Sequence, residues 1–114
     1  MDSFNTDFTK ALNLQEELQG NILERKQLIL KGNSTGRVDY RLKGGIDSLK
    51  NEMKQLEKIS YLYSNDNAKY KGISSKEKTK RIEMVKGFIS KSNKTIDDIS
   101  KIFGTSTDLI DLED

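Results

Sequence analysis

The sequence feature that most constrains the fold is a run of residues, mostly apolar, spaced alternately three and four positions apart near the end of the chain. Its members are Ile82, Val85, Ile89, Ser92, Ile96, Ile99 and Phe103. Side chains at this spacing lie on one narrow stripe of an α-helix, which is typical of a helix packed lengthwise against other helices. The run therefore predicts a long amphipathic helix whose stripe must be covered by partner helices.

Two earlier segments show the same helical periodicity. The first predicted helix spans about residues 4–31, and the glycine-containing stretch 32–36 ends it. The second spans about residues 37–64, and the polar segment 65–72 follows it as a longer loop. The stripe of the first helix is built on Phe8, Ala11, Leu12, Leu18, Ile22 and Ile29, and that of the second on Val38, Leu42, Ile46, Leu49, Met53, Leu56, Ile59 and Tyr63.

The third helix has the clearest boundaries. Ser74 followed three residues later by Glu77 fits a capping box, and Gly104 supplies a stop, so this helix is predicted over about residues 74–103. The start of the first helix is less sharply marked. Three residues there have side chains that can accept a hydrogen bond from a first-turn amide: Ser3, Asn5 and Thr6.

The stripes contain two kinds of anomaly. Gly45 falls on the stripe of the second helix, where a residue without a side chain costs helix stability and packing. This indicates either a close approach by a neighbouring helix or a kink or late start, and we favour a continuous helix. Polar residues also interrupt the stripes at Gln15, Arg25 and Ser92. They are interpreted as layers near the rim of the bundle, or as groups that set the register if they are paired.

Three long helices with short connections predict an all-α fold, an antiparallel up-down-up three-helix bundle. A chain of 114 residues is the size of one domain, and it contains no Pro to break a helix. We assign residues 1–104 to the bundle and residues 105–114 to an acidic flexible tail or the start of a linker. We expect the bundle to be a monomer in isolation.

The composition argues against an enzyme. The chain has no Cys and no His, which removes the commonest metal ligands and the commonest general base at neutral pH. We therefore expect no catalytic residue, no metal and no cofactor. We also expect no nucleic acid partner, because the net charge is only +2 and no recognition motif is present. Neither a membrane span nor a signal peptide is indicated, so this part of the protein is predicted to be soluble.

One basic cluster is a candidate surface for an acidic partner or for acidic lipid headgroups. Lys76, Lys78, Lys80 and Arg81 crowd the first turns of the third helix, where the helix dipole disfavours cations. Something acidic could compensate for this placement. The alternative interpretation is that these residues serve solubility, as surface lysines usually do.

A second candidate lies in the tail. Leu109, Ile110, Leu112 and Glu113 fit the clathrin-box pattern, a short peptide that docks in an extended conformation on a clathrin propeller. Such patterns arise often by chance, and a plain linker is the alternative.

Two patches of the sequence resemble a known family, the Qc-SNARE proteins, in their N-terminal three-helix domain of the syntaxin 8 and plant syntaxin 51 type. The first patch is Ala11–Arg25, with its leucine-rich start, its acidic pair and its Glu-Arg end. The second is Ile73–Glu77 followed by Arg81 and Met84–Val85, which is similar to the family's entry into its third helix. The resemblance spans about residues 7–103.

This resemblance implies a regulatory, protein-binding domain of a SNARE protein that acts in vesicle trafficking and membrane fusion. The implied location is the cytoplasmic face of endosomal, trans-Golgi or vacuolar membranes, and the implied partners are other SNAREs, tethering proteins or SM-type regulators. A linker, a SNARE helix and a membrane anchor would follow in a longer protein. The alternative function is a stand-alone helical adaptor that binds trafficking peptides, or clathrin through its tail.

Overall fold

The computed structural model describes residues 2–65 and 68–104. Over these residues the chain forms three long α-helices: α1 (Phe4–Leu30), α2 (Gly36–Ser64) and α3 (Ser75–Phe103), with a short 3-10 turn, η1 (Ala68–Tyr70), between the last two. The described residues contain no strand. The predicted helix boundaries agree with the observed ones to within one residue at each end, while η1 was not predicted.

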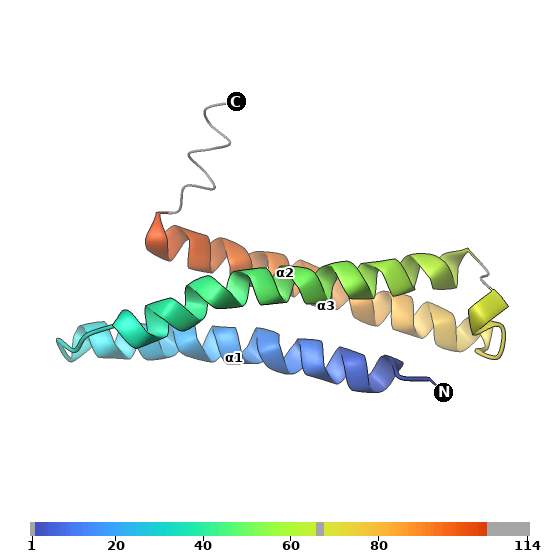
Figure 1. Ribbon diagram of the computed structural model, residues 1–114, viewed down its shortest axis with the longest axis horizontal. Coiled ribbons are helices and arrows are strands. Elements are labelled where there is room, and N and C mark those ends of the chain that lie inside the picture. The colour runs from blue at the N-terminus through green and yellow to red at the C-terminus, as the bar shows by residue number, and fades with distance from the viewer. Residues whose placement is uncertain (1, 66–67, 105–114) are drawn as a thin grey trace, which may run out of the picture.

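The helices run up, down and up, which confirms the predicted all-α three-helix bundle (Figure 1). α2 packs extensively against both other helices, and α1 and α3 meet over a smaller area. The N-terminus lies at the same end of the bundle as η1, and the hairpin between α1 and α2 forms the other end (Figure 1). The hairpin extends beyond the last residue of α3.

Local chemistry explains where α3 begins and ends. Ser74 has an extended backbone, and its hydroxyl accepts a hydrogen bond from the amide of Glu77 at 3.1 Å. The other half of the predicted capping box is replaced, because the Glu77 carboxylate accepts a hydrogen bond from Arg81. Gly104 ends the helix in the left-handed conformation, with φ of 53°, which a residue without Cβ adopts at little cost.

The start of α1 is capped by a residue that the sequence pattern did not single out. The side chain of Asp2, not that of Ser3, accepts a hydrogen bond from the amide of Phe4, at 3.2 Å. Ser3 occupies the cap position but directs its hydroxyl to the carboxylate of Asp7, at 2.9 Å. Asp2 is therefore the residue whose side chain caps the start of α1.

The seam of α3 is centred differently from the predicted stripe. Val85, Ser92 and Ile99 are buried as expected, but Ile82, Ile89, Ile96 and Phe103 are only half-buried. Phe88 and Thr95 are buried instead: the ring of Phe88 lies 5.9 Å from that of Phe8, and Thr95 accepts a hydrogen bond from Gln19. The difference arises because α3 packs against two helices. Its buried surface is therefore wider than one narrow stripe and includes Phe88 and Thr95 beside Val85, Ser92 and Ile99.

A polar pair lies in the middle of the bundle. Gln15 and Ser92 are both fully buried, and the Gln15 amide donates to the Ser92 hydroxyl at 2.6 Å and to the Phe88 carbonyl at 3.1 Å. The side-chain carbonyl of Gln15 is buried without a hydrogen-bond partner. These two residues form an internal pair that fixes the register of α1 against α3, and the alternative of a layer at the rim is wrong for them.

Gly45 permits a close approach between α1 and α2. A Cβ atom at this position would lie 2.2 Å from Cδ2 of Leu18, a side chain that is itself buried. The α2 helix is continuous through both glycines. The predicted alternative of a close helix approach is thus confirmed, whereas a Cβ at Gly44 would meet nothing within 4 Å.

The two adjacent glycines provide a matched stability test. Gly45→Ala should destabilise the fold by about 1–2 kcal/mol, because a methyl group must displace a packed Leu18. Gly44→Ala should instead stabilise it by about 0.5–1 kcal/mol, because Ala is the better helix former at an exposed site. Urea unfolding monitored by circular dichroism measures both. Equal effects of the two substitutions would contradict the close approach.

The central polar pair provides a second stability test. Gln15→Ala should cost about 1–3 kcal/mol, since it leaves a cavity and removes hydrogen bonds from buried groups. The double variant Gln15→Leu with Ser92→Ala should be as stable as the parent or more so, because both polar partners are replaced together. Thermal and urea unfolding of the three proteins check this. A double variant less stable than Gln15→Ala alone would contradict it.

Candidate interaction surfaces

The basic cluster predicted at the start of α3 does not form one surface. Lys76 and Lys80 are exposed and Lys78 is half-buried, whereas Arg81 is 5% exposed. The assignment of Arg81 to a surface for acidic partners or lipids was wrong. Its position on the helix turns it toward α1 and α2, where nearby carboxylates neutralise its charge, so three lysines remain as candidates.

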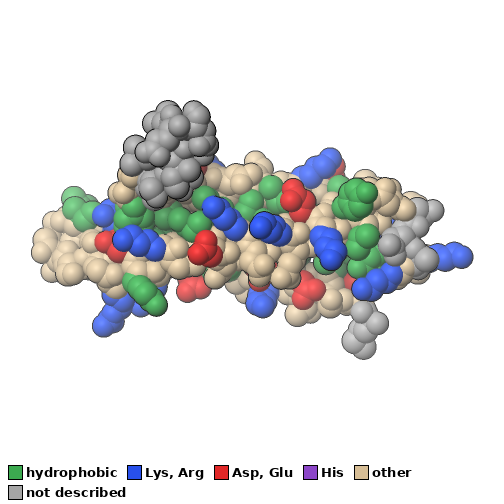
Figure 2. Space-filling view, turned by 45° about the horizontal axis from the view of Figure 1, so that its top comes forward, with side chains coloured by type: hydrophobic (Ala, Val, Ile, Leu, Met, Phe, Trp, Pro, Cys, Tyr) green, Lys and Arg blue, Asp and Glu red, His purple; other side chains and the backbone are tan. Residues whose placement is uncertain are grey.

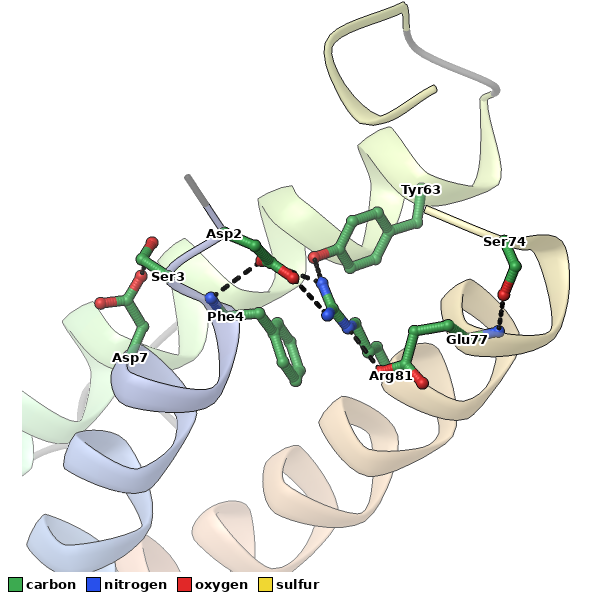
Figure 3. Close-up of polar contacts among 8 residues, drawn as sticks. All are labelled: Asp2, Ser3, Phe4, Asp7, Tyr63, Ser74, Glu77 and Arg81. Atoms are coloured by element: carbon green, nitrogen blue, oxygen red, sulfur yellow. Dashed lines mark hydrogen bonds and ion pairs between the residues drawn. The ribbon is translucent and has the colours of Figure 1, made fainter. Parts of the chain in front are cut away.

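Arg81 instead joins three parts of the chain at the N-terminal end of the bundle (Figure 3). Its Nε donates to the Glu77 carboxylate at 2.8 Å, and its Nη1 donates to Oη of Tyr63 at 3.0 Å. The two terminal nitrogens form a forked ion pair with the carboxylate of Asp2. The guanidinium carbon also lies 4.9 Å from the centre of the Phe4 ring. One side chain thus binds the start of α1, the end of α2 and the first turns of α3.

The ion pair shifts the acidity of the groups around it. The hydrogen bond from Arg81 holds the pKa of Asp2 below its ordinary value, against the smaller opposing effect of burial. The same hydrogen bond to Asp2 raises the pKa of Arg81, so this residue keeps its charge at every relevant pH. Burial raises the pKa of Tyr63, which therefore remains a neutral phenol that accepts from Arg81.

A cleft of about 530 Å³ lies beside this cluster. The N-terminal segment 2–4 forms one wall, and Tyr63 and Tyr70, whose rings are 5.0 Å apart at a steep angle, belong to its lining. The remaining lining residues are Ile59, Lys69, Gly72 and Ile73. The cleft is aromatic and apolar with one acidic and one basic residue in its lining, which suits a peptide side chain better than a polar metabolite.

At the opposite end of the bundle α3 stops before the α1–α2 hairpin does. Its last residue, Phe103, lies level with Arg25, whose guanidinium carbon is 5.6 Å from the ring centre, and Nζ of Lys43 lies 4.9 Å from the same centre. Arg25 is also paired with Asp39 at 2.8 Å, which makes it one of the register-setting groups anticipated from the sequence. The hairpin therefore continues past α3 with nothing on the α3 side of it among the described residues.

Three apolar side chains of α1 are exposed near and beyond the end of α3, and we call them the hairpin strip: Leu23, Ile29 and Leu30, which are 61%, 52% and 86% exposed. Gln19 marks the α3-facing side of α1 because its side chain donates to Thr95. Leu23 lies four residues after Gln19, and Leu30 lies seven residues after Leu23, so both are on the same side of the helix. The predicted stripe of the first helix included Ile29, and the apolar periodicity did not show that this residue would be exposed.

The charged side chains form no large single-sign patch on the face shown in Figure 2, where Lys and Arg alternate with Asp and Glu. Several exposed charged side chains of α3 are paired, such as Lys101 with Asp97 at 3.0 Å and Lys94 with Asp98 at 3.4 Å. Such exposed pairs contribute little to stability and serve mainly solubility. The clathrin-box-like residues Leu109, Ile110, Leu112 and Glu113 lie outside the described residues.

Within residues 2–65 and 68–104 no group of His, Cys, Asp and Glu side chains is arranged to hold a metal ion. None of the helices in the described part of the chain is both long and apolar enough to cross a bilayer. Comparison with protein-family models, with curated proteins and with solved structures found no match to this chain. The likeness to the Qc-SNARE domain therefore rests on the two sequence patches.

The Asp2–Arg81 pair predicts a specific dependence of stability on pH. Because the pKa of Asp2 is lower in the folded chain than in the unfolded one, its contribution is complete above the ordinary pKa of about 3.9 and is lost as the pH falls through the lower folded value. Asp2→Asn should cost about 1 kcal/mol or less at pH 7, since the carboxylate is 44% exposed.

Urea unfolding of the parent and of Asp2→Asn at pH 7 and at pH 2.5 measures this contribution. The difference between the two proteins should shrink at the lower pH, because the Asp2 carboxylate of the unfolded parent is protonated there and its pairing with Arg81 then favours the folded state less. Asn5→Ala, which removes an exposed neutral side chain from the first turn of α1, is the control and should behave alike at both pH values. A difference that is constant with pH would contradict the charge pairing.

Proposed function

We propose that this chain is the N-terminal regulatory domain of a SNARE protein, which binds partner proteins in vesicle trafficking and membrane fusion. Its sites of action are endosomal, trans-Golgi or vacuolar membranes, and its partners are other SNAREs, tethering proteins or SM-type regulators. The observation that carries the proposal is the hairpin strip, an exposed apolar surface at the end of a three-helix bundle, next to the point where the chain leaves α3.

The two patches that resemble the family support the proposal because they coincide with groups that build this bundle. The first patch, Ala11–Arg25, contains Gln15 of the central polar pair and Leu18, which fills the space above Gly45. The second contains Ser74, which caps α3, and Arg81, which joins the three helices. The resembling residues are therefore those that give the bundle its register.

An amphipathic helix of the partner is the occupant that best fits the hairpin strip. A helix placed end to end with α3 would cover Ile29 and Leu30 along the groove that α3 occupies lower down. Arg25 and Lys43 stand at the end of α3 where such a helix would begin. Acidic residues flanking the apolar face of the partner helix would complement these cations.

A binding assay on a defined panel tests the proposal. The panel consists of purified SNARE helices and SM-type regulators from endosomal, trans-Golgi and vacuolar compartments, titrated against the intact chain by calorimetry. The double variant Leu23→Ser with Leu30→Ser should weaken binding to the true partner at least about tenfold, because apolar anchors dominate such interfaces. It should leave stability nearly unchanged, because both side chains are exposed.

Tyr40→Ser is the matched control, because Tyr40 is 81% exposed and lies about half a helical turn from the buried Val38 and Leu42, on the face of α2 that points away from the bundle. Binding by no member of the panel would contradict the proposal, as would a coding sequence downstream of Asp114 that lacks both SNARE heptads and a membrane span. Binding of the clathrin terminal domain alone, abolished by Leu109→Ala with Leu112→Ala, would establish the adaptor function instead.

A further inference from the structure

The segment Asp2–Phe4 is held against the bundle in the way that a short peptide is held by its receptor. Asp2 provides a carboxylate for the fork of Arg81, and Phe4 provides an aromatic ring that is 2% exposed (Figure 3). The intervening Ser3 is exposed and bonds only within its own helix turn. The attachment of this segment to α2 and α3 thus depends on two side chains, an acidic one and an aromatic one, spaced two residues apart.

The receptor side of this contact is fixed by residues outside the segment. Glu77 accepts from Nε of Arg81, so the two Nη atoms of the guanidinium are directed toward the Asp2 segment as a ready carboxylate fork. The hydroxyl of Tyr63 accepts a hydrogen bond from Nη1 at 3.0 Å and helps to hold the guanidinium plane in this orientation. The Arg81 side chain is 6% exposed, so its charge is shielded from water and needs a carboxylate at the fork.

The aromatic half of the receptor surrounds the Phe4 ring. The ring centre lies 5.7 Å from that of Phe8 and 6.1 Å from that of Tyr63, and the Arg81 guanidinium covers it at 4.9 Å. These are distances at which aromatic and cation–π contacts are favourable. The Arg81 fork that binds the carboxylate is therefore adjacent to the aromatic surroundings of the Phe4 ring. Together these two parts select an acidic residue followed two positions later by an aromatic one.

We propose that the pocket formed by Arg81, Tyr63, Glu77 and Phe8 is a peptide-binding site for an acidic–x–aromatic motif of a partner protein, with Asp2–Phe4 as its resident intramolecular occupant. Displacement of the occupant removes one wall of the neighbouring cleft of about 530 Å³ and joins that cleft to the pocket. The cleft then receives residues of the partner next to the motif.

This site is separate from the hairpin strip, which lies at the other end of the bundle, and neither depends on the other (Figure 1). Only the first turn of α1 must open to empty it. Asp2 is 44% exposed, and the helix start has no hydrogen bond from the Ser3 side chain to its first amides. Ends of this kind open locally at a small fraction of the cost of global unfolding.

An intramolecular occupant competes strongly because its effective concentration is on the order of millimolar. The pocket is therefore empty in only a fraction of the molecules. The apparent affinity for a partner peptide equals its intrinsic affinity multiplied by this empty fraction. Weakening the occupant should increase the affinity for the same motif added in trans. This gain of binding distinguishes an exchangeable site from an ion pair that only stabilises the fold.

The experiment uses the full chain carrying Asp2→Ala and Phe4→Ala, and a fluorescent, N-acetylated peptide of residues 2–6 as the probe. The double variant should bind the probe at least about tenfold more tightly than the intact chain. The probe synthesised with Asp2→Asn, or with Phe4→Ala, should lose at least about tenfold in affinity. Adding Arg81→Lys to the double variant should weaken binding by a similar factor, because an ammonium group cannot form the fork.

Phe4→Ala removes a buried ring, so Asp2→Ala alone, which retains this ring, is measured alongside the double variant. Circular dichroism establishes which variants are folded, and a folded Asp2→Ala protein should show a smaller gain in the same direction. Equal probe binding by the intact chain and every folded variant would overturn the proposal, as would equal binding of the Asp2→Asn probe. Leu23→Ser with Leu30→Ser should leave probe binding unchanged, which separates this result from that of the hairpin strip.

Discussion

The constraint on which the structure depends is that each helix has one apolar stripe and must cover it with the other two. The stripes meet along Leu42, Leu49, Val85 and Ile99, all at most 1% exposed. Burial of such side chains contributes about 1.5–3 kcal/mol each to the stability of the fold. In a chain that is one-third charged, this burial stabilises the helices more than their intrinsic helix propensity does. The polar pair of Gln15 and Ser92 lies among them and makes one register preferable to its neighbours.

The three helices have similar lengths of 27, 29 and 29 residues, but α3 is shifted along the bundle away from the α1–α2 hairpin, which exposes the hairpin end (Figure 1). The α1–α2 hairpin continues past Phe103, so the stripe of α1 emerges at Ile29 and Leu30 without a covering helix among the described residues. At the opposite end the three helices begin or end close together, and Arg81 neutralises its charge with Asp2 and Glu77 there. One end of the bundle is thus an open apolar strip, and the other is a closed polar and aromatic cluster beside a cleft.

The charge pattern of the sequence led to a wrong prediction for Arg81, which is buried and not part of a basic surface. In sequence it belongs to a row of cations with Lys76, Lys78 and Lys80, and a helix start is an unfavourable place for them. Its burial depends on a carboxylate at position 2 and a phenol at position 63, neither of which is near it in the chain. Long-range partners of this kind leave no periodic signal, because they are brought together only when the helices pack.

The sequence by itself determined the number, boundaries and order of the helices, since apolar periodicity, the Ser74 cap and the glycine stops act locally. It also offered a close helix approach at Gly45 as one of two alternatives. Only the tertiary structure decided which side of the α3 stripe is buried, that Gln15 meets Ser92, and that Arg81 is internal while Leu30 is exposed. The physical reason is that burial of a given side chain depends on where the other two helices lie and where they end.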